Sequence, residues 1–154
     1  MTQETVIPKH PLAAGRSVPV GELWQFPEGL IGVGLSRAAL LPIADAAPFE
    51  LLCDADGSDF GLIVVDPQAL VADYVLALTP EELAPLGAVE PDALQIRVPV
   101  VLPGESSALT LNLKGPVLLA PQTRTGVQRV SLDEGHSLRY APDLTGTGTS
   151  SCSS

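Results

Sequence analysis

Residues 109–120 read Leu-Thr-Leu-Asn-Leu-Lys-Gly-Pro-Val-Leu-Leu-Ala, and this is the most informative stretch of the chain. Leucine alternates with a polar residue up to Lys114, as in a strand with one buried and one exposed face. Asn112 is unusual within a strand because its amide competes for backbone hydrogen bonds. Gly115-Pro116 then breaks the alternation before a second, apolar strand. The polar row is therefore either a recognition surface or the outer face of an ordinary barrel strand. Asn112 either pins the Gly-Pro turn or faces a partner.

Proline and glycine divide the rest of the chain into similarly short segments. The 154 residues include 15 prolines and 14 glycines, spread along the sequence. Frequent prolines and glycines between Val-, Leu- and Ile-rich segments are typical of an all-β sandwich or barrel. We therefore predict an all-β protein with a small β-barrel-like fold of about nine short antiparallel strands and one short helix. The expected strands span residues 18–24, 40–43, 49–53, 60–66, 74–78, 93–102, 109–114, 117–120 and 127–132, and a helix beginning at Gln68 is the alternative to the strand over 74–78.

The expected helix begins at Thr79, which can cap it, with Pro80 at the first helical position and Glu82 completing a capping box. Gly87 is expected to end it. We expect residues 1–15 to form a flexible N-terminal arm and residues 16–142 a single domain. Residues 143–154, rich in Gly, Ser and Thr, are expected to be disordered.

Charge and cysteine content restrict the classes of partner and the compartment. The formal net charge is −10, and the eight Lys and Arg residues form no cluster. This balance disfavours nucleic acid and anionic membranes and favours a basic protein partner. No apolar run is long enough for a membrane span and no secretory signal is visible. Cys53 and Cys152 are the only cysteines, which fits reduced thiols in a cytoplasmic protein.

The sequence offers little for catalysis or for metal binding. His136, with Asp133 or Glu134, is the one candidate for a histidine base, and we expect it to be a lone exposed histidine. The acidic run 54–59 resembles the start of a calcium loop, but the glycine and glutamate required later in such a loop are absent. We therefore interpret it as a hairpin turn and expect a protein that is not an enzyme and has no cofactor.

Six segments, in this order, are similar to motifs of one known family. They are residues 26–32 (Phe-Pro-Glu-Gly-Leu-Ile-Gly), 41–52, 60–67, 73–74, 111–117 (Leu-Asn-Leu-Lys-Gly-Pro-Val) and 126–130 (Gly-Val-Gln-Arg-Val). Together they cover about residues 18–140, and over this range the chain resembles the flagellar assembly factor FliW family. It departs from the family pattern at Val33-Gly34, where an aromatic residue is usual, at Gly115, where Ala is usual, and at Arg129, where an apolar residue is common.

The resemblance implies a compact, non-catalytic β-barrel-like protein of the cytoplasm. Its implied partners are flagellin and the translational repressor CsrA, which it would bind and antagonise, relieving repression of flagellin synthesis. We expect a monomer, without direct binding to nucleic acid or membrane. The solvent-facing residues of the matching motifs are the candidate partner contacts: Glu28, Asp66, Asp73, Asn112 and Lys114. A small-molecule-binding β-barrel without catalysis is the alternative.

Overall fold

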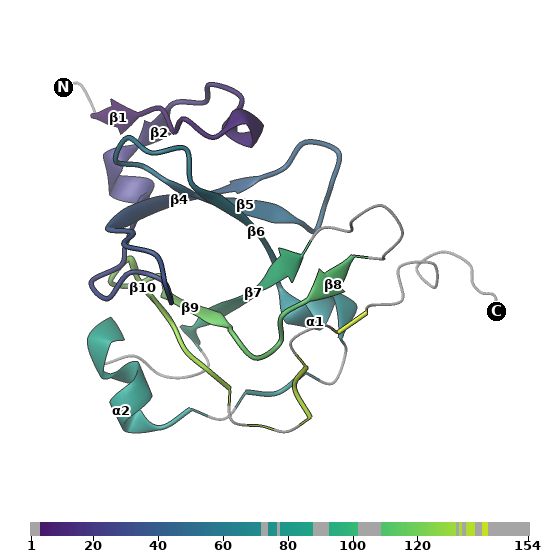
Figure 1. The fold of residues 1–154 in the computed structure, drawn as a ribbon. Helices are drawn as coiled ribbons and strands as arrows, with labels where there is room; N and C mark the ends of the chain where they lie inside the picture. Colours follow the sequence, from purple (N-terminus) through teal and green to yellow (C-terminus); the bar gives the residue numbers. More distant parts are fainter. Residues whose placement is uncertain are drawn as a thin grey trace.

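The computed structural model describes residues 4–71, 74–76, 78–87, 93–101, 109–131, 133, 135–137 and 140–141. Seven strands close into a barrel in the order β6-β5-β4-β3-β10-β9-β7, and β7 pairs with β6 to complete the ring (Figure 1). The strands are β3 (Trp24–Gln25), β4 (Arg37–Pro42), β5 (Glu50–Asp54), β6 (Gly61–Val65), β7 (Gln95–Val101), β9 (Val117–Ala120) and β10 (Thr125–Gln128). A further strand, β8 (Thr110–Leu111), pairs with β7 beside the ring. The predicted all-β barrel fold is confirmed.

One pairing in the ring differs from the antiparallel arrangement that we predicted. β3 and β10 run parallel where Thr125 lies opposite Gln25, and the other strand pairs are antiparallel. The backbone N–H of Gln25 donates to the carbonyl of Arg124 at 2.7 Å. The Arg124 guanidinium lies 3.9 Å from the centre of the Trp24 ring, so a cation–π contact supports the same seam.

The beginning of the described chain forms a small sheet of its own. β1 (Thr5–Val6) pairs with β2 (Val18–Pro19), and the 3-10 turn η1 (Pro11–Ala13) lies between them. The predicted strand 18–24 is interrupted by a second 3-10 turn, η2 (Val20–Glu22), before β3 begins. Pro19 lacks the N–H that would continue a ladder. The flexibility expected of residues 1–15 stays a prediction, and the expected tail 143–154 lies outside the described residues.

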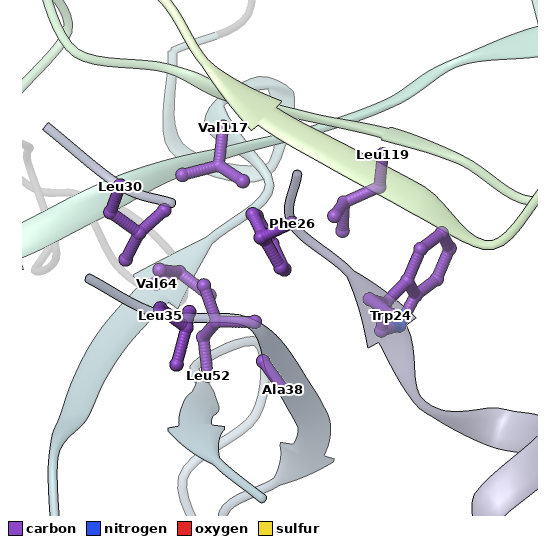
Figure 2. Close-up of a cluster of buried hydrophobic side chains, with 9 residues drawn as sticks. All are labelled: Trp24, Phe26, Leu30, Leu35, Ala38, Leu52, Val64, Val117 and Leu119. Atoms are coloured by element: carbon purple, nitrogen blue, oxygen red, sulfur yellow. The ribbon is translucent and has the colours of Figure 1, made fainter. Parts of the chain in front are cut away.

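Side chains from opposite walls fill the barrel interior (Figure 2). Phe26 and Leu30 enter from the loop that follows β3, while Leu52, Val64 and Leu119 come from the strands. All of them are buried. A ligand-binding barrel needs interior space, so this apolar packing argues against the small-molecule alternative.

Two short α-helices stand outside the ring. α2 (Pro80–Leu83) begins at the predicted capping box, in which Thr79 Oγ1 accepts from Glu82 N and the Glu82 carboxylate accepts from Thr79 N. It continues into η3 (Ala84–Leu86), which ends at Gly87. α1 (Pro67–Leu70) includes Gln68, from which a helix is the predicted alternative to a strand, and it begins one residue earlier. In the segment predicted as a strand over 74–78, the described residues 74–76 and 78 belong to no strand, and that prediction is wrong there.

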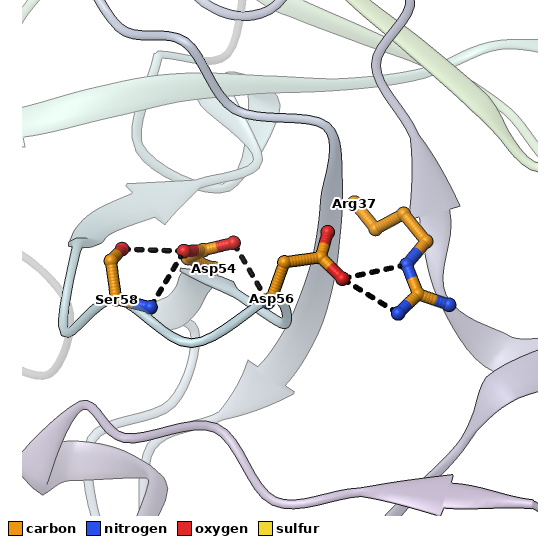
Figure 3. Close-up of polar contacts among 4 residues, drawn as sticks. All are labelled: Arg37, Asp54, Asp56 and Ser58. Carbon is orange, nitrogen blue, oxygen red and sulfur yellow. Dashed lines mark hydrogen bonds and ion pairs between the residues drawn. The ribbon is translucent and has the colours of Figure 1, made fainter.

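The turn between β5 and β6 confirms the hairpin interpretation of the acidic run (Figure 3). The Asp54 carboxylate accepts hydrogen bonds from the backbone N–H groups of Asp56 and Ser58 and from Ser58 Oγ. Asp56 in turn accepts two bonds from Arg37, at 3.0 and 2.6 Å. The acidic side chains therefore organise the turn itself.

Candidate functional site

Three of the six motif segments meet at one place on the barrel, and the side chain of Gln128 joins them. Gln128 lies at the end of β10. Its Oε1 accepts from the N–H of Ile31 at 2.9 Å, and its Nε2 donates to the carbonyl of Gly115 at 2.8 Å. One side-chain amide thus holds the 26–34 loop and the 112–116 turn against the end of β10.

Arg129 adds a second set of connections at the same junction. Its guanidinium lies 2.9 Å from the Glu28 carboxylate and donates to the carbonyl of Glu82 on α2 at 3.3 Å. Its backbone N–H donates to the carbonyl of Pro116 at 3.0 Å. Arg129, which stands where the family pattern commonly has an apolar residue, therefore connects the loop, the turn and α2.

Asn112 pins the Gly-Pro turn, which is the first of the two roles left open above. Its Oδ1 accepts from the N–H of Lys114 at 3.0 Å, and its own N–H donates to the carbonyl of Pro99. A Cβ at Gly115 would lie 2.9 Å from Asn112 Nδ2 and 3.1 Å from Gln128 Nε2. Glycine at this position therefore leaves room for both amides.

A buried polar cluster supports the turn that follows. The N–H of Ser131 donates to the carbonyl of Lys114 at 2.8 Å, and Ser131 Oγ lies 2.5 Å from His136 Nδ1. The His136 ring stacks on Tyr74 with 4.7 Å between centroids and lies 3.8 Å from the Asp133 carboxylate. His136 is only 8% exposed, so the expectation of a lone exposed histidine is wrong. The sequence does not reveal this burial, because Tyr74, on which the ring stacks, lies far from His136 along the chain.

Burial raises the pKa of the Tyr74 hydroxyl to about 12, and the negative charge of Asp133 contributes in the same direction. Tyr74 therefore stays neutral throughout the physiological range. Its ring serves as a packing platform for His136.

Beside this junction the surface is hollowed and carries exposed apolar side chains. Ile31 and Val130 are 57% and 55% exposed, and both line a hollow of about 270 Å³. A neighbouring hollow of about 490 Å³ shares Arg129 and Val130 with it and continues over Leu76 and Leu78. The sequence does not single out Ile31 or Val130, because an alternating pattern does not tell which apolar side chain remains exposed.

The candidate contact residues are only partly brought together. Glu28, Asn112 and Lys114 lie around the junction just described. Asp66 instead caps α1 by accepting from Gln68 N, and it lines a different hollow of about 580 Å³. Asp73 lies outside the described residues. Contact with a partner stays a prediction for all five.

Neither a metal site nor a membrane-spanning helix is found in the part of the chain that the structure describes. In the described ranges, no three His, Cys, Asp or Glu side chains are grouped so that they could hold a metal ion. None of the helices there has the length and apolar character needed to cross a membrane.

Comparisons with known proteins point to one family. The solved structure titled "Crystal structure of the flagellar assembly factor FliW" superposes with a TM-score of 0.75 at 17% identity, over 90% of this chain and 96% of that one. This shows a shared fold. The flagellar assembly factors FliW of Leptospira interrogans (serovar copenhageni) and Thermotoga maritima are each 31% identical over 120 residues, covering 77% of this chain and 80% of theirs. The model of the family described as FliW protein matches residues 16–142. The chain therefore belongs to the FliW family.

Proposed function

We propose that this protein is a non-catalytic, monomeric flagellar assembly factor that binds flagellin in the cytoplasm and binds and antagonises the translational repressor CsrA. Membership of the FliW family over residues 16–142 is the observation that carries the proposal. The net charge of −10 supports it, because an acidic protein associates faster with a basic, RNA-binding partner. Antagonism of the repressor would then relieve repression of flagellin synthesis.

The motif junction is the proposed contact region. Glu28, Asn112 and Lys114 lie there, and the Gln128 and Arg129 hydrogen bonds fix the backbone on which they are carried. Asp66, which lies outside this region, and Asp73 are kept as further candidate contacts. A fixed surface loses less conformational entropy on binding than a mobile one, which favours recognition at this place.

Calorimetric titration of the purified chain with cognate flagellin and, separately, with CsrA tests the proposal. We expect micromolar or tighter binding to each, and weaker binding to CsrA as salt rises from low to physiological concentration, because exposed charges are screened. A reporter carrying the flagellin leader, repressed by CsrA in a cell-free translation system, should recover when this protein is added. No detectable binding to either protein would contradict the proposal.

A further inference from the structure

We propose that the two adjoining hollows around Arg129 and Val130 form one docking surface for a basic, amphipathic segment of a protein partner. The segment would place one apolar side chain between Ile31 and Val130 and a second over Leu76 and Leu78. Lysine or arginine side chains would meet the carboxylates beside it. The inference rests on the proposed binding role, but it does not depend on which partner is bound.

The first step is the apolar character of the surface. Ile31 and Val130 are each more than half exposed although they lie beside buried neighbours such as Leu30. Large apolar residues that are exposed together beside a hollow are typical of interaction sites. The hollow between them measures about 270 Å³, and the one that continues past Val130 about 490 Å³. Each has room for a large apolar side chain.

The second step is that the surface is preformed. The N–H of Ile31 is held by the Gln128 amide, and the loop closes by bonds between Leu30 and Val33 in both directions. Gly29 has a φ of +67°, and a Cβ there would lie 2.6 Å from the carbonyl oxygen of Val33. The exposed Ile31 side chain is therefore carried on a tight, fixed loop. It need not be ordered when a partner binds.

The third step is the charge around the hollows. Of the two basic residues at the surface, Arg129 is neutralised by its ion pair with Glu28, whereas Lys114 Nζ donates to the uncharged backbone carbonyl of Asp133 and keeps its charge. Glu82 and Asp133 line the larger hollow, and within the described residues neither carboxylate pairs with a lysine or arginine. Glu82 and Asp133 together outweigh the single charge of Lys114, so the charge left to a partner is negative and a basic segment fits better than an acidic one.

The test uses a synthetic helical peptide of leucine and lysine and its leucine–glutamate counterpart, titrated into the full chain by fluorescence anisotropy. We expect the lysine peptide to bind and the glutamate peptide not to bind. Ile31→Ser and Val130→Ser leave the net charge unchanged and should each weaken binding by about tenfold, as for central interface residues. Ile7→Ser and Val101→Ser are the matched controls, since these residues are 61% and 51% exposed and line neither hollow. They should bind as the wild type does.

A second arm isolates the charge. Glu82→Gln keeps an acceptor for the α2 cap, and together with Asp133→Asn it should reduce the salt dependence of peptide binding. In NMR spectra of the wild type, amide shifts on peptide addition should cluster around Ile31 and Arg129. Shifts clustered elsewhere, equal loss in the control variants, or no binding of the lysine peptide overturn the inference. If the peptide binds as expected but flagellin and CsrA do not, the proposed function fails and this inference stands.

Discussion

At the scale of single residues, the Gln128 amide organises most of the candidate surface. Its oxygen accepts from the N–H of Ile31, and its nitrogen donates to the carbonyl of Gly115. These two residues belong to different motifs. A side-chain amide carries a donor and an acceptor on separate atoms, whereas an ionised carboxylate can only accept. The hydrogen bonds of this residue therefore explain why three distant segments share one place.

We predict that Gln128→Leu lowers the free energy of unfolding by about 1–3 kcal/mol, since it removes two hydrogen bonds that each contribute about 0.5–1.5 kcal/mol. Gln128→Glu is the matched variant, because it keeps the acceptor for Ile31 and loses only the donor to Gly115. We expect its loss to be smaller than that of the leucine variant at low salt. Urea unfolding followed by circular dichroism measures both. A leucine variant as stable as the wild type would show that these bonds contribute nothing.

A second prediction at this scale concerns Asp54 and pH. Burial by itself would raise the pKa of this carboxyl, but the bonds from Ser58 Oγ and from the neighbouring backbone N–H groups outweigh it and lower the pKa below the ordinary 3.8. The folded state therefore favours the ionised form. Its contribution is fully present above pH 3.8 and declines as the pH falls through the lowered value.

Accordingly, Asp54→Ala should be less stable than the wild type at pH 6, and the difference should shrink at pH 3. Urea midpoints at the two pH values give the comparison. Asp59→Ala provides a control in the same turn, because Asp59 is exposed. A difference for Asp54→Ala that is constant with pH would exclude the charge as the cause.

At the scale of elements, the sequence predicts correctly those structures that are held by contacts between residues close together in the chain. The capping box at Thr79 and the hairpin at residues 54–59 form as predicted, since every group involved lies within a few residues of its partner. The predicted strand 127–132 instead begins at Thr125 and ends at Gln128. Arg129 and Ser131 bond to the carbonyls of Pro116 and Lys114 outside the strand ladder, and no local pattern encodes that.

We expect Thr79→Ala to destabilise the protein by about 0.5–2 kcal/mol, the usual effect of losing an N-cap. Thr79→Ser keeps the hydroxyl that accepts from Glu82 N and should retain most of the stability. Thermal unfolding by calorimetry compares the two variants. Equal melting temperatures for the alanine and serine variants would mean that the cap makes no contribution.

At the scale of the whole molecule, the closure of the barrel depends on side-chain size where strands approach each other. Gly126 on β10 faces the interior, and a Cβ there would lie 2.6 Å from Phe26 Cζ and 2.9 Å from Leu119 Cδ2. Both neighbours are buried core residues that have little room to move. A glycine is therefore required at this position by packing.

Gly126→Ala should lower the free energy of unfolding by about 1–3 kcal/mol through overpacking. Gly34→Ala is the matched control, because no atom lies within 4 Å of a Cβ added there. Chemical unfolding of the two variants checks the prediction. If both alanine variants unfold at the same denaturant concentration, the packing around β10 does not restrict the size of the side chain at position 126.

The sequence therefore indicated the all-β class, the hairpin and the capped helix, and the resemblance of its motifs indicated the family. It did not indicate the parallel β3–β10 pairing or the burial of His136 beside Tyr74. Each of these joins residues that are distant in the chain. Periodicity reports which face of a segment is apolar, and it contains no information on which other segment covers that face.

The parallel seam also has a consequence for how the protein is made. β10 lies between β3 and β9 in the ring, so β3 keeps one free edge until residues 125–128 have left the ribosome. Contacts between such distant parts of a chain form late and slow folding, while an open strand edge can pair with other chains. Closure of the barrel is thus a late event of synthesis, and the nascent chain exposes an unpaired strand edge until residues 125–128 have left the ribosome.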